Sequence, residues 1–557
     1  MPSKYKMLLQ LMDRAEHEKS SKIYDYFQKC KALARVIKAR RVPSLPGLAI
    51  GQNVPDRPVA DSLIDGYLRT FETVYRVLHV PSFKAEYQRY WQNPEAAGHP
   101  FVVLMQLCMA IGACFYDDTH SYRTQATRWV YEAKLWLMTP PEKSRLTIAG
   151  LQIMCLVQLA KQTAGISGDL TWISAGSLVR SAILMGLNHD PSTLVRMSAF
   201  RAEMRRRLWA TILEINLQSS LDAGALPLIS PSEYDTQPPA NFSDEELLLD
   251  QPPSPKPNSY TQTTIQIALL KSLPIRHAII NHINNPHPQL SYEETLRLSA
   301  ALQSATRTLF QRLHFFPSTP ETPSTTSFQQ AFLHHILARH LLTLHTLFHT
   351  PSPVHHFSRT TAVAAAKTLI TLHRASTSPD FTRLYINASG PFRSTPVHAC
   401  LALTLEYIAL REEEDQDQAL VLPNDKKSEE LREIIVDWQT ELWMKRIKSG
   451  ETNIKAYAFG QVLGLLIDVV DKQEDVMGLI MEEAMGRVKE CGEMLKELAG
   501  EDVGEQDGEE EIEEEAVQGA EMGLGDFDID FGWIDGVDGM GWDEGGVGVN
   551  SFDLFFK

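Results

Sequence analysis

The sequence predicts an all-α protein that ends in a disordered acidic segment. Apolar residues recur at helical spacing from about residue 61 to about residue 500. No run alternates apolar and polar residues as a strand does, and no Asn-Gly or Asp-Gly hairpin connects such runs. The chain has 557 residues, 43% of them hydrophobic, which is enough to bury a sizeable core. Collagen-like and wholly disordered classes are therefore excluded.

Charge is distributed unevenly along the chain. The formal net charge is −17, but residues 501–557 alone contain 19 Asp/Glu and one Lys. Residues 1–41 contain 11 Lys/Arg against 4 Asp/Glu. The protein thus has a basic head, a nearly neutral body and an acidic tail. Such asymmetry suggests that the two ends interact with other molecules.

The cysteine content and the N-terminus indicate a soluble intracellular protein. The six cysteines form no Cys-x-x-Cys pair, which excludes a disulfide scaffold and fits a reducing compartment. The first residues, MPSKYKMLLQ, lack the apolar core of a signal peptide. The longest apolar run, residues 101–115, is too short to cross a bilayer.

Residues 1–41 are predicted to form a basic amphipathic helix, followed by a linker over residues 42–60. The helix carries a heptad seam, spaced alternately by three and four residues: Ile23, Tyr26, Cys30, Leu33 and Ile37. Two heptads do not by themselves make a stable coiled coil. Two interpretations therefore remain open, a helix packed on the body of its own chain and a dimerisation helix.

Residues 61–250 are predicted to be a helical domain. One helix has a stripe that begins at Trp172 and ends at Gly186, with Pro191 just beyond. The next runs from about Ala202 to Asp222 and ends before Gly224 and Pro227.

Residues 251–500 are predicted to continue the same helical region between Pro-rich breaks at 251–257, 316–324 and 350–353. The periodicity predicts these helices: Thr264–Ile283, Ser291–Phe315, Phe328–His349, Ala362–Ser376, Pro396–Glu413, Ser428–Lys448 and Ile454–Val470.

Residues 501–557 have the composition of a disordered activation tail. Acidic residues alternate with large apolar ones, and charge repulsion would keep those apolar side chains available to a groove on a partner. The aromatic residues expected to carry this function are Phe527, Phe531, Trp533, Trp542, Phe552, Phe555 and Phe556.

Candidate catalytic and metal-binding groups do not converge in the sequence. The Asp117-Asp118 pair resembles the metal-binding aspartates of all-α isoprenoid synthases but lacks a third carboxylate, so a solvated turn is favoured. His345 and His349 have metal-binding spacing, yet no further ligand is near, and a neutral, partly buried helix face is favoured. Arg205, Arg206 and Arg207 point in three directions and are expected to form surface ion pairs. We predict no catalytic, cofactor-binding or metal-binding residues, and no enzyme.

Five segments in order resemble a known regulatory domain. They read YLRTFETVYRVLHVPSF (67–83), PFVVLMQLCMAIGACF (100–115), LQIMCLVQLAKQ (151–162), TWISAGSLVRSAILMGLNHD (171–190) and EMRRRLWATILEINLQSSLDAGALPLISPSEYDTQPPANFSDEEL (203–247). Together they resemble the middle domain of fungal-specific transcription factors of the zinc-cluster class. The residues that match the family pattern are His79, Pro81, Phe83, Trp172, Gly186, Leu187, Asp190, Arg205, Arg206, Trp209, Gly224 and Pro227.

The roles expected for these residues are structural. Trp172 and Trp209 are expected to fill core positions between helices, and Pro81 and Pro227 to terminate helices. The arginines at 205–207 are expected to hold loops such as YDTQPP through ion pairs or carbonyl contacts.

The resemblance implies a nuclear regulator of RNA polymerase II transcription that acts with DNA and with transcriptional coactivators. Family members carry a six-cysteine zinc cluster that reads DNA, but the first cysteine here is Cys30 and stands alone. Zinc is therefore expected only if such a cluster lies upstream of this chain. Otherwise DNA would be reached through a partner.

Two other functions remain as alternatives. One is a cofactor or decoy that makes no DNA contact of its own and forms a heterodimer with a full-length relative. Formation of a homodimer also remains possible as an expectation. The last is an all-α metal-dependent enzyme.

Overall fold

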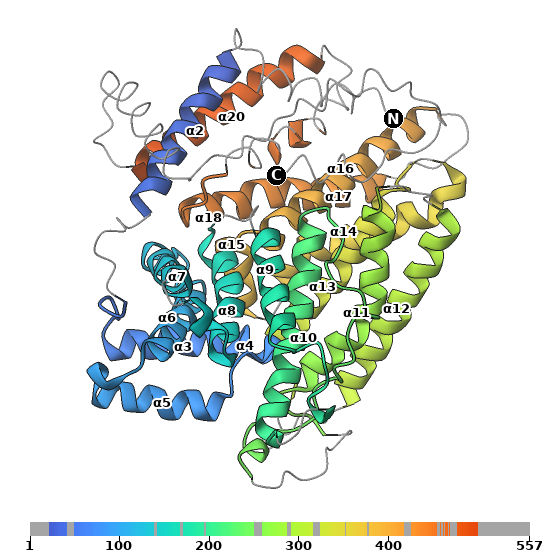
Figure 1. Ribbon diagram of the computed structural model, residues 1–557. Helices are drawn as coiled ribbons and strands as arrows, with labels where there is room; N and C mark the ends of the chain where they lie inside the picture. The colour runs from blue at the N-terminus through green and yellow to red at the C-terminus, as the bar shows by residue number, and fades with distance from the viewer. Residues whose placement is uncertain are drawn as a thin grey trace. The chain divides into compact units, whose positions relative to one another are not determined.

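The structure is a computed structural model, and every regular element that it describes is a helix (Figure 1). It describes residues 22–41, 50–138, 142–166, 171–193, 197–249, 259–286, 291–315, 324–350, 352–375, 378–416, 425–453, 457, 460–461, 463–465, 467 and 476–499. The predicted all-α class is thus confirmed. None of the described helices combines the length and the apolar character needed to cross a membrane.

The chain divides into two compact units. One unit comprises residues 44–344 and 372–393, and the other comprises residues 1–43, 345–371 and 394–557. Helix α11 (Thr264–Asn284) packs on α10 (Ala199–Asp222) within the first of these units, because both helices bury polar residues that need each other as partners.

The unit of residues 44–344 and 372–393 is built around helix α6 (His99–Ala113). Its other helices are α3 (Arg57–Arg69), α4 (Glu72–Tyr75), α5 (Val80–Gln92), α7 (Arg123–Met138), α8 (Ile148–Ala164), α9 (Thr171–Leu184), α10, α11, α12 (Tyr292–Phe315), α15 (Pro379–Asn387) and all but the end of α13 (Ser327–Thr346). Helix α6 is apolar on all sides, and every residue from Phe101 to Ala113 is buried as α3, α7 and α8 pack around it.

Two proline positions differ from expectation. Pro81 lies in the first turn of α5, so it begins a helix and does not terminate one. Its missing N–H is harmless there, because the first backbone N–H groups of a helix have no partner within it. Likewise, Pro58 lies in the first turn of α3, which starts at Arg57, inside the segment expected to be a linker.

Glycines end α9 and α10. Gly186 and Gly224 both adopt a left-handed conformation, with φ of 70° and 59°. The N–H of Leu187 returns to the carbonyl of Ala182 at 3.0 Å, which closes the end of α9, and the Leu187 side chain is fully buried. Pro227 follows α10 in an irregular segment after Gly224 and is not itself the terminator.

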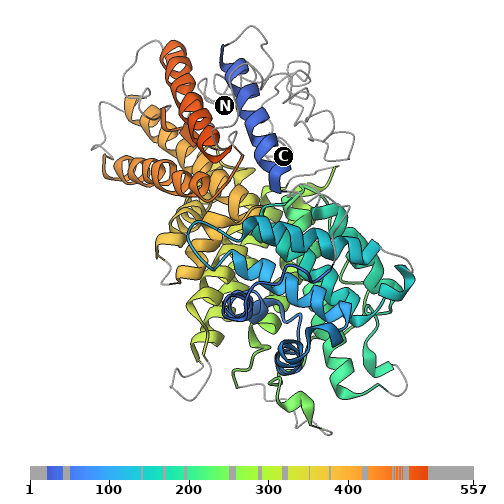
Figure 2. The same cartoon turned by 90° about the vertical axis from the view of Figure 1, so that its left-hand side faces the viewer.

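The other unit contains helices from both ends of the chain. They are α2 (Lys22–Arg41), α17 (Asp425–Asp437), α18 (Trp443–Lys448), α20 (Val476–Ala499) and most of α14 (His356–Ala375) and α16 (Pro391–Gln416). A π-helical turn, Trp438–Leu442, joins α17 to α18. Both views show α2 and α20 side by side (Figures 1 and 2).

Some predictions fall on residues that the structure does not describe. Residues 1–21 and the whole acidic tail, including its seven aromatic residues, lie outside the described residues. Most of the helix predicted over Ile454–Val470 does so as well.

Candidate functional site

The most unusual feature of the described residues is a buried polar stripe along α10. Its residues are spaced by four, four, three, four and four positions, so they share one face of the helix: Glu203, Arg207, Thr211, Glu214, Gln218 and Asp222. The first five are at most 5% exposed. Polar groups buried in this way require partners, and the stripe finds them on α4, α11, α13 and the loop after α10.

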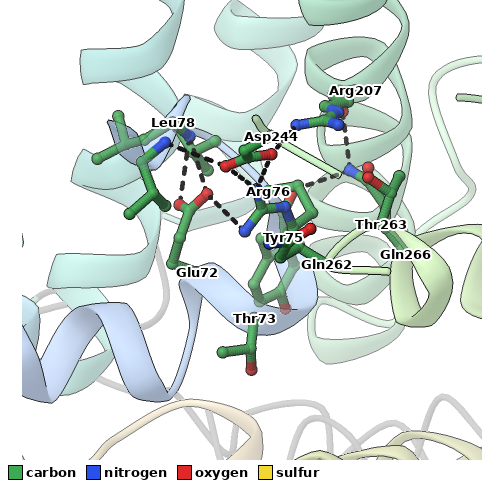
Figure 3. Close-up of polar contacts among 12 residues, drawn as sticks. Glu72, Thr73, Tyr75, Arg76, Leu78, Arg207, Asp244, Gln262, Thr263 and Gln266 are labelled. Atoms are coloured by element: carbon green, nitrogen blue, oxygen red, sulfur yellow. Dashed lines mark hydrogen bonds and ion pairs between the residues drawn. The ribbon is translucent and has the colours of Figure 1, made fainter. Parts of the chain in front are cut away.

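At one end of the stripe, two arginines converge on one buried carboxylate. Arg76 Nη2 lies 2.5 Å from Asp244 Oδ2, and Arg207 Nη1 lies 2.7 Å from Asp244 Oδ1 (Figure 3). Glu72 and Glu203 complete this group, with Glu72 Oε1 3.6 Å from Arg76 Nη1 and Glu203 Oε1 3.5 Å from Arg207 Nε. We call these five residues the Asp244 cluster. It contains three carboxylates and two guanidinium groups.

Arg76 reaches this position through an uncommon backbone conformation. It follows α4 with a φ of 54°, in the left-handed region that non-glycine residues rarely adopt. Its side chain is buried against Asp244, so the ion pair holds the strained residue in place.

The cluster shifts the proton affinities of its carboxylates in opposite directions. Burial alone would raise the pKa of Asp244, but Arg76 and Arg207 outweigh it and lower the pKa to about 2. Burial dominates at Glu72 and raises its pKa to about 7, although Arg76 and the Tyr67 hydroxyl act against it. The Tyr67 hydroxyl donates to Glu72 Oε2 at 2.5 Å.

The middle of the stripe is bridged by one glutamine of α11. Gln266 Nε2 donates to the carbonyls of Tyr75 and Arg207, at 2.8 and 2.9 Å, and lies 3.0 Å from Thr211 Oγ1 (Figure 3). Together with Glu214 and apolar side chains, Tyr75, Thr211 and Gln266 line a small cavity between α4, α10 and α11. Gln266 thereby ties the three helices together through their backbone.

The far end of the stripe forms a second set of ion pairs. Arg276 of α11 binds Glu214 with two hydrogen bonds, of 2.7 and 2.8 Å. Arg339 of α13 donates to Gln218 at 2.8 Å and pairs with Asp222. Every carboxylate of the stripe thus has an arginine partner.

The described residues offer structural polar networks and no assembled catalytic group. The stripe carboxylates are engaged by arginines, and burial raises the pKa of the Cys155 and Cys400 thiols, which makes them poor nucleophiles. Among the described residues, no group of three or more His, Cys, Asp or Glu is placed to hold a metal ion. The stripe instead fixes the relative positions of four helices.

The first family motif is attached directly to the Asp244 cluster. His79 caps α5, with Nδ1 2.7 Å from Ser82 Oγ and Nε2 2.8 Å from the backbone oxygen of Asp244. The N–H of Val80 donates to Asp244 Oδ2 at 3.2 Å. Phe83 is buried and its ring packs against Phe101. The motif therefore anchors the start of α5 to the loop that carries Asp244.

The second and third motifs are joined by arginines of α10. Arg206 binds Asp190 with two hydrogen bonds, of 2.9 and 2.8 Å, and Arg205 Nη2 donates to the carbonyls of Met185 and Gly186. Asp190 also accepts from the N–H of Gln237, in the YDTQPP loop, at 2.9 Å. Loops after α9 and α10 are thus held to α10 through one carboxylate.

Three expectations about these residues need correction. Arg207 is fully buried in the Asp244 cluster and forms no surface ion pair. Pro81 starts α5 and does not end a helix. Trp172 is only half-buried, whereas Trp209 is 2% exposed and packs edge-on against Tyr234.

The other candidate groups do not form a site. Asp117 accepts hydrogen bonds from Thr119 and Ser121 in a turn, and Asp118 pairs with Arg383. His345 lies 2.8 Å from Ser358 Oγ while His349 faces Glu406, so the two histidines point to different partners. Burial lowers the pKa of His345 to about 4, which keeps it neutral.

The sequence indicated only part of this site. The polar residues of α10 are visible in the sequence, but the face that they share was not predicted. Glu72, Arg76, Asp244, Gln266 and Arg276 carry no local signal of their own. Their partners lie up to 191 positions away in sequence.

Comparison with known proteins gives one family for the region that holds this site. Residues 64–315 match the model of the fungal specific transcription factor domain. The chain is 34% identical to transcription factor asR3 of Sarocladium schorii, over 78% of this chain and 54% of that protein. It is 30% identical to the aspyridones cluster regulator apdR of Emericella nidulans, over 58% of this chain and 46% of that protein. It is 25% identical to the Zn(2)-C6 fungal-type transcription factor mpsB of Macrophomina phaseolina, over 56% of this chain and 44% of that protein.

These matches indicate a regulator of transcription and not an enzyme. The chain spans about half the length of the curated relatives that it matches. No solved structure matches it.

Proposed function

Because this chain belongs to the proteins with a fungal-specific transcription factor domain, we propose that it is a nuclear regulator of RNA polymerase II transcription. The observation that carries the proposal is the family match over residues 64–315, the segment that contains the α10 polar stripe. In this proposal the helical region is the regulatory domain. Residues 501–557 are the activation tail, which recruits coactivators through its aromatic residues.

Sequence-specific DNA contact is proposed to come from outside residues 1–557. The relative mpsB is named as a Zn(2)-C6 fungal-type factor, and the chain covers 44% of it. One route is a zinc cluster encoded upstream of Met1, and the other is a DNA-binding partner protein. Residues 1–557 themselves are proposed to hold no zinc.

The relative apdR is named as the regulator of a cluster. By analogy, this chain is proposed to control a group of neighbouring genes. Disruption of its gene, followed by RNA measurement across the genome, tests this proposal. We expect loss of expression of a contiguous set of genes, restored by reintroduction of the gene. Unchanged transcript levels under every growth condition in which the gene is expressed would overturn it.

The tail is tested separately from the family assignment. Residues 501–557 are fused to an unrelated DNA-binding domain and a reporter gene is measured. We expect activation that is lost when the seven tail aromatics are replaced by Ala. A matched control replaces seven tail glycines by Ala and should keep activity. No activation by the wild-type tail would remove the activation role and leave the family assignment untouched.

A non-DNA-binding cofactor that forms a heterodimer with a full-length relative is the second candidate. Mapping the 5′ end of the native transcript separates the two routes. An upstream six-cysteine cluster in frame supports direct DNA binding, and its absence from the transcript supports a partner.

A further inference from the structure

Helix α8 carries a buried lysine that differs from the buried arginines around the α10 polar stripe. Lys161 is 3% exposed, and its ammonium group donates to the Ser174 hydroxyl of α9 at 3.2 Å. The arginines of the stripe face carboxylates, as Arg276 faces Glu214. Among the described residues, no carboxylate pairs with Lys161. A buried charge without a counter-charge is costly, so this lysine lacks a partner that its position requires.

The groups around Lys161 have hydrogen-bond donors that no described residue accepts. An ammonium group has three N–H donors, and Ser174 accepts one of them. Because the Ser174 hydroxyl accepts from Lys161, its own proton goes to Gln158 Oε1 at 2.8 Å or to the Thr171 carbonyl at 3.1 Å. The nitrogen of the same Gln158 amide has no acceptor among the residues that the structure describes. Donors are therefore in excess at this position.

A second lysine adds positive charge to the same place. Helix α8 packs against both α7 and α9 (Figure 1), and Lys134 of α7 is half-buried, with its ammonium group 4.8 Å from the centre of the Tyr131 ring. Within the described part of the chain, no carboxylate pairs with Lys134 either. Burial and then the charge of Lys134 lower the pKa of Lys161 to about 8, so Lys161 is still mainly charged at pH 7.

We propose that Lys161, Lys134 and Gln158 form a binding site for a small oxyanion, either a carboxylate or a phosphate. An oxyanion accepts several hydrogen bonds at once and neutralises positive charge, and these are the two properties that the described surroundings of Lys161 lack. Lys134 and Ser174 are only half-buried, so a solute can approach the group from outside. The site lies in the family domain, but the inference does not depend on a role in transcription.

Thermal unfolding of the full chain tests the site. Inorganic phosphate and acetate are each compared with sodium chloride at equal ionic strength. We expect one or both anions to raise the melting temperature of the wild-type protein by about 2–4 °C. A rise with phosphate alone identifies a phosphate site, and a rise with acetate alone identifies a carboxylate site. No rise with either anion would overturn the proposal.

Variants separate binding at this site from a general effect of salt, which acts on every variant alike. Lys161→Met should lose the rise. The matched control is Lys84→Met, which removes the same charge from an exposed position of α5 and should keep it. If circular dichroism shows that Lys161→Met does not fold, Lys134→Met at its half-buried position replaces it and should reduce the rise. A rise in the folded variant equal to that of Lys84→Met would show that these lysines hold no anion.

Discussion

At the scale of single residues, Asp244 holds together several segments that are far apart in the sequence. It neutralises Arg76 and Arg207, accepts from the N–H of Val80, and offers its backbone oxygen to His79. Removing it would leave two guanidinium groups in the core without their principal counter-charge. A buried ion pair adds little net stability when intact, but breaking one side of it is costly.

Asp244→Ala is therefore expected to lower the free energy of unfolding by about 3–5 kcal/mol. Urea unfolding followed by circular dichroism measures the change. The control is Asp118→Ala, which also removes a carboxylate paired with arginine but at a side chain 81% exposed. It should cost less than about 1 kcal/mol. A similar small loss for both variants would contradict the importance given to the cluster.

Glu72 gives the cluster a pH dependence of opposite sign to that of Asp244. Its pKa in the folded protein is raised to about 7, so the folded state holds a proton that the unfolded state releases near pH 4.5. Its stabilising contribution is present below that pH and is lost as the pH rises to about 7. Relative to Glu72→Gln, which cannot titrate, the wild-type protein should lose stability between about pH 5 and about pH 8. Urea unfolding at each pH measures this difference, and parallel profiles would contradict it.

At the scale of elements, close helix contacts depend on glycine where no side chain fits. Gly66 of α3 and Gly112 of α6 face each other, and a Cβ on Gly112 would come within 1.7 Å of the Leu63 carbonyl oxygen. Backbone atoms cannot move away as a flexible side chain could. The contact therefore sets how deeply α3 packs on the central helix.

Gly112→Ala is expected to separate α3 from α6 and to destabilise the protein by about 1–3 kcal/mol or more. Thermal unfolding and the buried-tyrosine signal of Tyr67 report the change. Gly486→Ala makes the same substitution within a helix, at a position with open space. It should leave stability unchanged or raise it slightly. Equal tolerance of both substitutions would show that the α3–α6 contact can relax.

At the scale of the whole molecule, the strongly charged segments of the sequence and the family domain fall in different units. Helix α2, which is part of the basic residues 1–41, and helix α20, which precedes the acidic residues 501–557 in the sequence, belong to one unit. The other unit holds the family domain and its buried polar stripe. This separation suggests that electrostatic interactions with other molecules involve the unit that contains α2 and α20, while the unit with the family domain provides a fixed scaffold.

The purified 557-residue chain is therefore expected to bind duplex DNA weakly and without sequence preference. Its affinity should fall steeply as salt rises, because binding depends on displaced counterions. Fluorescence anisotropy with two unrelated duplexes, at salt concentrations from about 50 to about 200 mM, measures this. Addition of zinc or of a chelator should change nothing. A zinc-dependent preference for one sequence would show that these residues contain a DNA reader.

Local sequence signals were sufficient for the helical class, most helix positions and the family resemblance. These signals are the 3.6-residue period, glycine at the ends of α9 and α10, and motifs read in order. Helices predicted at Thr264–Ile283 and Ser291–Phe315 match α11 and α12 within one residue at each end. The same signals gave the wrong role to Pro81, because a proline at either end of a helix looks alike without knowledge of which side the helix lies on.

The buried polar network and the packing of α20 on the α2 seam, by contrast, depend on contacts between residues far apart in the sequence. The partners of Arg207, Gln266 and Arg276 come from other helices or from the loop after α10, and no local period reports such a pairing. The α2 seam was visible, but its partner, α20, lies more than four hundred residues away. Burial forces charged groups to meet across those distances, since an unpaired charge in the core is too costly to keep.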